Sequence, residues 1–113
     1  MSCIFCRIAS GEIPARLVYE DEEVVAFHDQ HPQAPVHVLV IPRRHVESLA
    51  ETTAADDALL GHVLATVRNV AQQLDLPEKG YRTVLNTGAH AGQSVQHLHA
   101  HLLAGRMLHW PPG

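Results

Sequence analysis

The sequence predicts an α+β protein built around an antiparallel β-sheet. Strand-like segments come first, one long amphipathic helix follows, and further strand-like segments come last. Strands and helices that are segregated in this way are typical of the α+β class. A chain of 113 residues has the usual size of one domain and can bury a core. We therefore expect residues 1–113 to form a single domain.

The first strands are predicted from short apolar and β-branched runs. Residues 17–19 and 24–27 lie on either side of an acidic segment and indicate a hairpin. Residues 36–41 form a β-branched strand that ends at Pro42. The preceding segment, residues 31–35, contains two prolines and is expected to be a loop.

The long helix is the clearest of the predicted elements. Apolar residues recur at three- and four-residue steps over residues 59–74. Residues 53–56 resemble a capping box, with aspartate in place of the more usual glutamate. We expect Pro77 and Gly80 to end this helix.

Composition and charge argue against nucleic acids and membranes as binding partners. The formal net charge is −4 and the largest basic cluster is Arg43-Arg44, which argues against binding to nucleic acid. No apolar run approaches the roughly 20 residues that a membrane helix requires. The N-terminus lacks the pattern of a signal peptide, so we expect a cytoplasmic protein without a membrane partner.

Histidine is unusually frequent, with ten residues in the chain. His97, His99 and His101 alternate with apolar residues in the last predicted strand, residues 95–103, which follows a strand over residues 81–86 and a glycine-containing loop. Because side chains alternate across a strand, the three histidines are expected to share one face. The other, mostly apolar face is expected to pack on the core.

This spacing suits phosphate chemistry, because a neutral imidazole is a nucleophile and a protonated one donates to phosphate oxygens. We therefore predict a phosphate-handling site with His99 as nucleophile. Two alternatives stay open from spacing alone. The three histidines could hold a metal ion, or they could lie on an edge strand without a function.

Residues 97–103 read His-Leu-His-Ala-His-Leu-Leu, and this run resembles the motif of the histidine triad (HIT) family of nucleotide hydrolases and transferases. The resemblance covers nearly the whole chain and is closest to the Hint branch, whose C-terminal Trp-Pro-Pro-Gly matches residues 110–113. Other matching segments are residues 4–5, 12–15, 19–21, 26–29, 32–37, 40–45, Asn86 and residues 92–95.

The resemblance implies a HIT-like fold, with a five-stranded antiparallel sheet, one long helix and one short helix. It also implies a homodimer with a continuous ten-stranded sheet, in which the long helix and residues 81–86 lie near the two-fold axis. Residues 108–113 are then expected to reach toward the neighbouring active site, with disorder as the alternative for a chain terminus.

The activity implied is that of a purine nucleoside phosphoramidase, which cleaves the P–N bond of nucleoside 5′-phosphoramidates through a nucleotidyl-histidine intermediate. By resemblance, His99 attacks phosphorus, His101 contacts the phosphate and Ser94 lies near the leaving amine. Catalysis of this kind needs no metal if hydrogen-bond donors are preorganised. A nucleotidyl transferase and a nucleotide-binding scaffold with incidental hydrolysis are the alternative functions.

The nucleotide contacts are also implied by the resemblance. Asp29 would bind the ribose hydroxyls, for which a carboxylate is suited because it accepts two hydrogen bonds. The purine would lie among Ile4, Phe5, Ile8, Phe27 and His28, and the phosphate end would be lined by Asn86, Gly92, Gln93, Ser94 and Val95. Alternatively, the apolar residues are simple core, and Asp29 and Asn86 are turn residues.

Cys3 and Cys6 are the second chemical signal, because a C-x-x-C turn can bring two thiols onto one metal ion. Bacterial proteins that this chain resembles complete such a site with histidines at the positions of His45 and His97. The resemblance therefore implies a structural Zn²⁺ and makes His97 either a zinc ligand or an orienting residue in catalysis. A redox pair and two ordinary thiols are the alternatives.

Overall fold

The computed structural model describes residues 3–113 and contains a five-stranded sheet with the strand order β1-β2-β3-β5-β4. Each neighbouring pair in it is antiparallel, so the predicted α+β class is confirmed. The strands are β1 (Leu17–Glu20), β2 (Val24–His28), β3 (Val36–Pro42), β4 (Arg82–Val84) and β5 (Ala100–Ala104).

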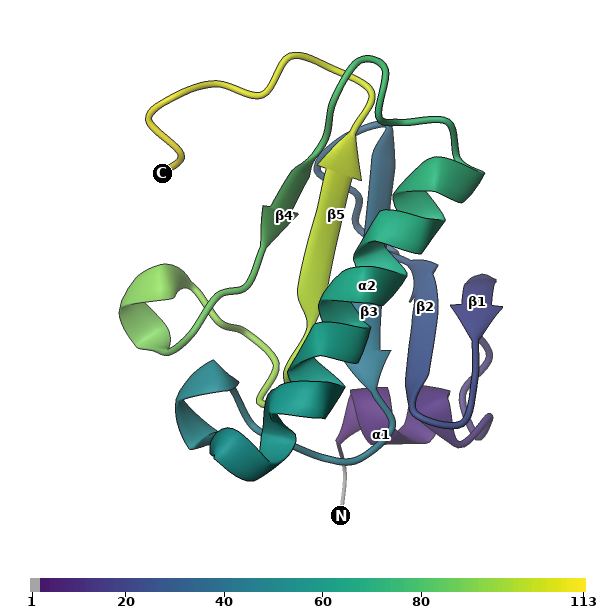
Figure 1. The fold of residues 1–113 in the computed structure, drawn as a ribbon, viewed down its shortest axis with the longest axis vertical. Coiled ribbons are helices and arrows are strands. Elements are labelled where there is room, and N and C mark those ends of the chain that lie inside the picture. Colours follow the sequence, from purple (N-terminus) through teal and green to yellow (C-terminus); the bar gives the residue numbers. More distant parts are fainter. Residues whose placement is uncertain (1–2) are drawn as a thin grey trace.

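Two α-helices cover opposite faces of the sheet (Figure 1). The long helix α2 (Asp57–Gln73) crosses one face, and the short helix α1 (Ile4–Ala9) packs on the other. Three 3-10 turns complete the structure: Leu49–Glu51, Ala54–Asp56 and Ala89–Ala91. No helix among residues 3–113 is both long and apolar enough to span a bilayer.

The central strand β3 is buried on both faces, which explains why its sequence is continuously apolar rather than alternating. Val38 and Val40 belong to the core under α2, whereas Leu39 and Ile41 pack toward α1. Ala100 and Leu102 of β5 also face α2, as the alternation of the histidine motif predicts. The neighbouring His101 therefore points to the α1 face of the sheet, where the candidate site lies.

Helix α2 begins as predicted but ends earlier than predicted. Thr53 and Asp56 form the expected capping box, one 3-10 turn ahead of the α-helix. The helix ends at Gln73, before Pro77 and Gly80, because Asp75 adopts a left-handed conformation with φ of 59°. The Leu76 amide then bonds back to the Ala71 carbonyl at 2.9 Å, which closes the helix end.

The last strand is shorter than the predicted strand over residues 95–103. Strand β5 begins only at Ala100, where the ladder with β3 starts. Before that point, the backbone leaves the sheet and bonds to the loop after β3, with the Leu98 amide donating to the Val46 carbonyl. His97 and His99 therefore precede the strand, and the prediction that all three histidines stand on one strand face was wrong.

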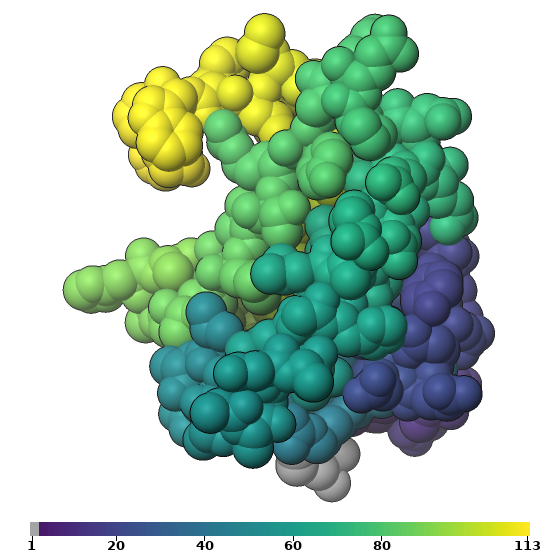
Figure 2. All heavy atoms as spheres, in the orientation of Figure 1, coloured from purple at the N-terminus to yellow at the C-terminus, as the bar shows by residue number. Residues whose placement is uncertain are grey.

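The C-terminal tail, residues 105–113, stands away from the body of the molecule (Figure 2). A groove of about 570 Å³ lies at its base, lined by residues 79–82 and 105–108. The Arg82 guanidinium donates to the His109 carbonyl at 2.8 Å, whereas Trp110 is 80% exposed. The tail is thus hydrogen-bonded to the edge strand β4, whereas the Trp110 indole is left largely exposed by the rest of residues 3–113.

Candidate active site and metal centre

His99 directly precedes β5, lies next to Phe5 of α1 and is almost completely buried. Its Nδ1 atom lies 2.7 Å from the carbonyl oxygen of His97. Because a carbonyl oxygen only accepts hydrogen bonds, Nδ1 must carry a proton. In the neutral ring, this leaves the lone pair on Nε2, which is the form that an imidazole nucleophile requires.

Aromatic rings hold His99 from two sides. The centroid of its ring lies 5.1 Å from that of Phe5 and 4.9 Å from that of His101, both with edge-to-face geometry. Phe5 comes from α1, so the short helix helps to fix the ring. Sequence reasoning expected Phe5 to contact the purine and did not predict that it packs on the His99 ring.

A second histidine pair lies next to His99. Nε2 of His37 is 2.9 Å from Nδ1 of His101 and 3.5 Å from Oδ2 of Asp29. Burial lowers the pKa of His37, and it lowers the pKa of His101 to about 4, with His99 and His37 adding to that shift. Both rings are therefore neutral at pH 7. Sequence reasoning gave His37 no role, although an isolated histidine within a buried apolar strand is a signal in itself.

The loop before the histidine motif is shaped by two glycines with positive φ, Gly88 at 82° and Gly92 at 79°. The buried side chain of Gln93 closes it. Its amide oxygen accepts from the Gly88 amide, and its amide nitrogen donates to the carbonyls of Glu47 and Val95. Gln93 therefore positions the loop with its side chain and can offer a ligand only its backbone.

The other residues expected at the phosphate end stand around this loop. Ser94 is exposed, whereas Asn86 and Val95 are half-buried. Ser94 and Val95 line a cavity of about 420 Å³ that also touches Cys3 and His45. The loop thus exposes the Ser94 hydroxyl shortly before the chain reaches His97 and His99.

The residues expected around the purine differ in exposure. Phe5, Ile8 and Phe27 belong to the buried core between α1 and the sheet, and the two phenyl rings meet edge to face at 5.6 Å. Only Ile4, at 46% exposure, and the half-buried His28 offer substantial surface. Burial lowers the pKa of His28, with help from Arg16, so this ring presents a neutral face.

Asp29 directly follows β2 and is held by its turn. Its Oδ1 atom accepts the His31 amide at 2.8 Å, and its own amide donates to the His37 carbonyl. Its second carboxylate oxygen, Oδ2, lies toward His37. Asp29 is therefore both a turn residue, as one alternative expected, and a neighbour of the histidine pair.

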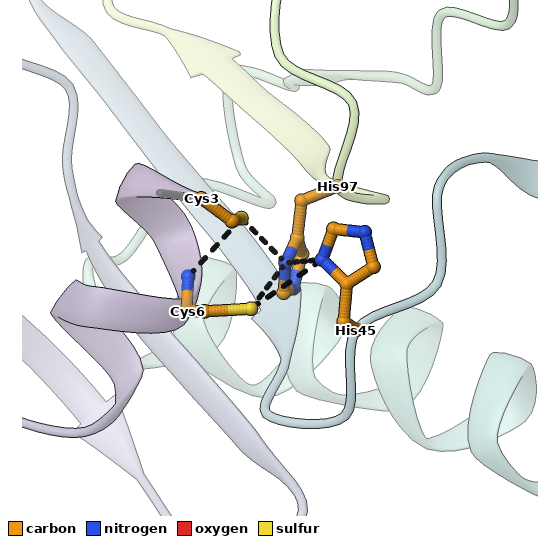
Figure 3. Close-up of side chains that lie close together, drawn as sticks. All are labelled: Cys3, Cys6, His45 and His97. Carbon is orange, nitrogen blue, oxygen red and sulfur yellow. Dashed lines mark hydrogen bonds between the residues drawn. The ribbon is translucent and has the colours of Figure 1, made fainter. Parts of the chain in front are cut away.

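The two thiols and two imidazoles converge at one point (Figure 3). Cys3 caps α1 and Cys6 lies one turn later, so both sulfurs face the same side of the helix. His45 comes from the loop after β3, and His97 comes from the segment before β5. The four candidate ligands lie within 4.8 Å of one another, as sequence reasoning expected.

The geometry of this cluster fits a tetrahedral metal ion. Nδ1 of His97 lies 3.3 Å from Sγ of Cys3 and 3.5 Å from Sγ of Cys6. Nδ1 of His45 lies 3.4 Å from Sγ of Cys6 and 3.2 Å from Nδ1 of His97. Typical Zn–S and Zn–N bonds of about 2.3 and about 2.0 Å give a tetrahedral sulfur–nitrogen edge of about 3.5 Å and a nitrogen–nitrogen edge of about 3.3 Å.

The protonation of His97 also suits a metal ligand. Its Nε2 atom lies 2.8 Å from the Pro42 carbonyl and must therefore donate, which leaves a lone pair on Nδ1 facing the thiols. Burial lowers the pKa of the fully buried His97, which keeps this ring neutral. Burial and the neighbouring Cys3 raise the pKa of Cys6, so a metal ion would displace a thiol proton on binding.

The comparisons with known proteins agree on one family. A family model described as "HIT domain" matches residues 10–108. The chain is 58% identical over 110 residues to an uncharacterized HIT-like protein of Synechococcus elongatus, covering 97% of this chain and 96% of that protein.

Solved structures give the same result. A HIT family hydrolase from Legionella pneumophila superimposes with a TM-score of 0.97 and 46% identity, covering 99% of this chain and all of that one. A histidine triad protein from Clostridium difficile gives a TM-score of 0.93 at 42% identity, with 96% and 94% covered. A histidine triad nucleotide-binding protein from Candida albicans gives 0.82 at 37% identity, with 89% and 73% covered.

Proposed function

Because the chain belongs to the HIT domain family, we propose that it is a hydrolase of the Hint branch that cleaves the P–N bond of purine nucleoside 5′-phosphoramidates. Adenosine 5′-monophosphoramidate represents this substrate class. The proposal is supported by relatives described as a HIT family hydrolase and as a nucleotide-binding protein. The C-terminal Trp-Pro-Pro-Gly at residues 110–113 supports the branch.

One observation carries the proposed chemistry: His99 donates its Nδ1 proton to the His97 carbonyl and keeps a lone pair on Nε2. In the first step, Nε2 forms a bond to phosphorus while the P–N bond of the substrate breaks, and the amine leaves after taking a proton from solvent. In the second step, water attacks the phosphorus and the Nε2–P bond breaks. The nucleoside monophosphate is released, the proton of the water passes to solvent, and neutral His99 is restored. The ring needs no rotation between the steps, because its Nδ1 proton stays bonded to the same carbonyl.

The remaining residues have supporting roles in this proposal. Asp29 binds the ribose through its second carboxylate oxygen, Oδ2. Ile4 and His28 offer surface for the purine, with Phe5, Ile8 and Phe27 behind them. Ser94 lies near the leaving amine, and the amides of Gly92, Gln93 and Val95 and the side chain of Asn86 line the phosphate end. His101 donates to the phosphate. Catalysis in this scheme requires no metal.

A product analysis separates this function from its two alternatives. Incubation with adenosine 5′-phosphoramidate in ¹⁸O-labelled water is expected to give AMP that carries one ¹⁸O atom, as measured by mass spectrometry. A transferase would instead give ADP when inorganic phosphate is added, because phosphate replaces water as the acceptor. A scaffold protein with incidental hydrolysis would bind AMP in a calorimetric titration but turn over the phosphoramidate only at a trace rate. Either of these results contradicts the proposed hydrolase.

We also propose that Cys3, Cys6, His45 and His97 hold a structural Zn²⁺. A site with four protein ligands has no open position for substrate, so this metal would tie α1 to the sheet rather than react. His97 is then a ligand whose backbone, not its ring, serves catalysis. Free thiols at this site suit the reducing cytoplasm, where we expect the protein to act.

We further propose a homodimer of single-domain chains, residues 1–113, with a continuous ten-stranded sheet. The edge strand β4 has a partner on one side only within the described residues. Several large apolar side chains are also exposed: Tyr81 just before β4, Met107 and Trp110 in the tail, and Leu64 on α2. Pairing of β4 with its symmetry mate would satisfy the open strand edge and cover these side chains.

The dimer predicts a particle of twice the 12.4 kDa chain mass. Size-exclusion chromatography with light scattering at micromolar concentration measures this directly. A Trp110→Ala variant tests the tail, and it is expected to weaken association because the indole is 80% exposed in the single chain. A wild-type particle with the mass of one chain would contradict the dimer.

A further inference from the structure

Glu47 lies in the loop after β3 and lines the cavity of about 420 Å³ that Ser94 and Val95 also line. Among residues 3–113, it is the only acidic residue at this cavity, and no lysine or arginine lines the cavity. Sequence reasoning gave Glu47 no role. Cavities of this volume are in the usual range for small-molecule sites, so there is room for a small organic group beside the Glu47 side chain.

The cavity meets both ends of the proposed nucleotide site. Ile4, which offers surface for the purine in that proposal, lines the cavity from α1. Ser94 and Val95, which are proposed to lie near the leaving amine and the phosphate, line it from the loop before the histidine motif. The Gln93 side chain ties this loop to the segment of Glu47, because its amide nitrogen donates to the Glu47 carbonyl at 2.7 Å. Glu47 therefore has a fixed position relative to the phosphate end.

The direction of the attack determines where the leaving amine lies. His99 is almost completely buried and keeps its lone pair on Nε2. In phosphoryl transfer, the attacking and leaving atoms lie roughly in line on opposite sides of phosphorus. The amine therefore points away from the buried ring and toward the surface, which the cavity reaches at the exposed Ser94. The groove of about 570 Å³ at the tail touches none of the residues proposed for the nucleotide.

No basic side chain forms an ion pair with Glu47 within the part of the chain that the structure describes. Two arginines precede it in the same loop, but both have other partners. Arg43 lies 2.8 Å from the Glu20 carboxylate, and Arg44 pairs with Asp56. The proposed Zn²⁺ would not replace them, because its two thiolate ligands cancel its charge. The negative charge of Glu47 is therefore left to attract a cation in the cavity.

We propose that this cavity is the subsite of the leaving amine and that Glu47 makes the enzyme prefer amines with a second, positively charged nitrogen, such as alkyl diamines. This inference rests on the proposed function. The reacting nitrogen would lie at Ser94, and the alkyl chain would lead the second nitrogen, which is an ammonium at pH 7, toward Glu47. The reaction is unchanged, because the same P–N bond breaks and the diamine leaves. Exposed ion pairs are weak, so Glu47 gives a preference rather than a strict requirement.

A matched series of adenosine 5′-phosphoramidates tests the charge alone. The amines are 1,4-diaminobutane, n-pentylamine and 5-aminopentanoic acid, whose equal methylene chains end in an ammonium, a methyl group and a carboxylate. Glu47→Gln removes the charge of the side chain and nearly keeps its shape. Glu78→Gln is the control, because Glu78 is exposed in the turn after α2, does not line the cavity and changes the net charge equally.

The first readout is the Kd of each compound by calorimetry in His99→Ala, which lacks the nucleophile and leaves the compounds largely intact. The diamine compound is expected to bind about fivefold tighter than the pentylamine compound, and the carboxylate compound about fivefold weaker. Salt at about 1 M should level the three Kd values, because it screens exposed charges. Equal Kd values at low salt would overturn the subsite.

The second comparison assigns the preference to Glu47. Glu47→Gln, added to His99→Ala, is expected to bring the three Kd values within about twofold of one another, whereas Glu78→Gln should keep their order. An order that survives Glu47→Gln would overturn the role of Glu47.

The third readout is kcat/KM for amine release in the enzyme with His99 intact, where the same order is expected, again about fivefold at each step. A kcat/KM that is equal for the three compounds would overturn the preference in catalysis. If the Kd values follow the expected order but no compound is turned over, the subsite is supported while the proposed function fails.

Discussion

His99→Ala is expected to lower the single-turnover rate with adenosine 5′-phosphoramidate by about 10⁴-fold or more. The reason is that the substituted enzyme has lost the lone pair that forms the bond to phosphorus. The other groups, His101 and the loop amides, can still bind the nucleotide and stabilise a direct attack by water. A rapid-quench assay that follows release of the amine measures the rate.

A second variant shows whether the loss is chemical. His99→Gly leaves a space that free imidazole can enter, and added imidazole is expected to restore part of the turnover, with adenosine 5′-phosphorimidazolide or AMP as product. Retention of near wild-type turnover by His99→Ala would contradict His99 as the nucleophile.

The geometry explains why His99 differs from its neighbours in the motif. All three histidines have one ring nitrogen that is fixed by a hydrogen bond, but the acceptors and donors differ. His97 and His99 each donate to a backbone carbonyl, and His97 also faces the thiols. His101 accepts from His37, because the Gln33 amide donates to Nδ1 of His37 and leaves the proton of that ring on Nε2. His97 and His101 thus carry the proton on Nε2, whereas His99 carries it on Nδ1, and only His99 keeps its lone pair on Nε2.

Local patterns were enough to predict most of the fold. The hairpin, β3 and α2 follow from apolar periodicity, turn residues and a capping box, all of which act within a few residues. The end of α2 was misplaced because the left-handed Asp75 stops the helix, a position that glycine occupies more often. Pro77 and Gly80, which were expected to end the helix, lie beyond its actual end at Gln73.

The error at the histidine motif has a different cause. Alternation over residues 95–103 looks like a strand, yet the His97 ring bonds to Pro42 at the end of β3 and the Leu98 amide bonds to Val46 in the loop after it, instead of to a ladder. A local pattern cannot report such long-range partners. For the same reason, the place of His37 in the site was missed, since its contacts with Asp29, Gln33 and His101 form only in the folded chain.

The second large effect is expected on removal of the metal. Protein purified without a chelator or a histidine tag should contain about one zinc ion per chain, and its removal should lower the unfolding temperature by about 10 °C or more. The ion would connect Cys3 and Cys6 of α1 to His45 and His97, so its binding free energy contributes to folding. Elemental analysis and thermal unfolding measure the two quantities. Less than about half a zinc ion per chain would contradict the site.

His45→Ala provides the matched variant, because His45 is the proposed histidine ligand that lies outside the catalytic motif. It is expected to lose zinc and to unfold at the temperature of chelated wild type, and chelator should then have no further effect on it. His90→Ala, on the exposed loop turn, is the control and should keep its zinc. A chelator effect of equal size on His45→Ala and on wild type would show that chelation acts elsewhere.

His97 belongs to the proposed metal site and also contacts the nucleophile His99. This double contact predicts a second effect of zinc removal. The ring of His97 would bind the ion, while its carbonyl accepts the Nδ1 proton of His99 at 2.7 Å. Loss of zinc frees His97 to move, so His99 loses a fixed acceptor and kcat is expected to fall about 10- to 100-fold, as for other supporting groups around metal ligands. Added zinc should restore both kcat and the unfolding temperature. If chelated protein that is still folded keeps its full kcat, the metal stabilises α1 without orienting His99.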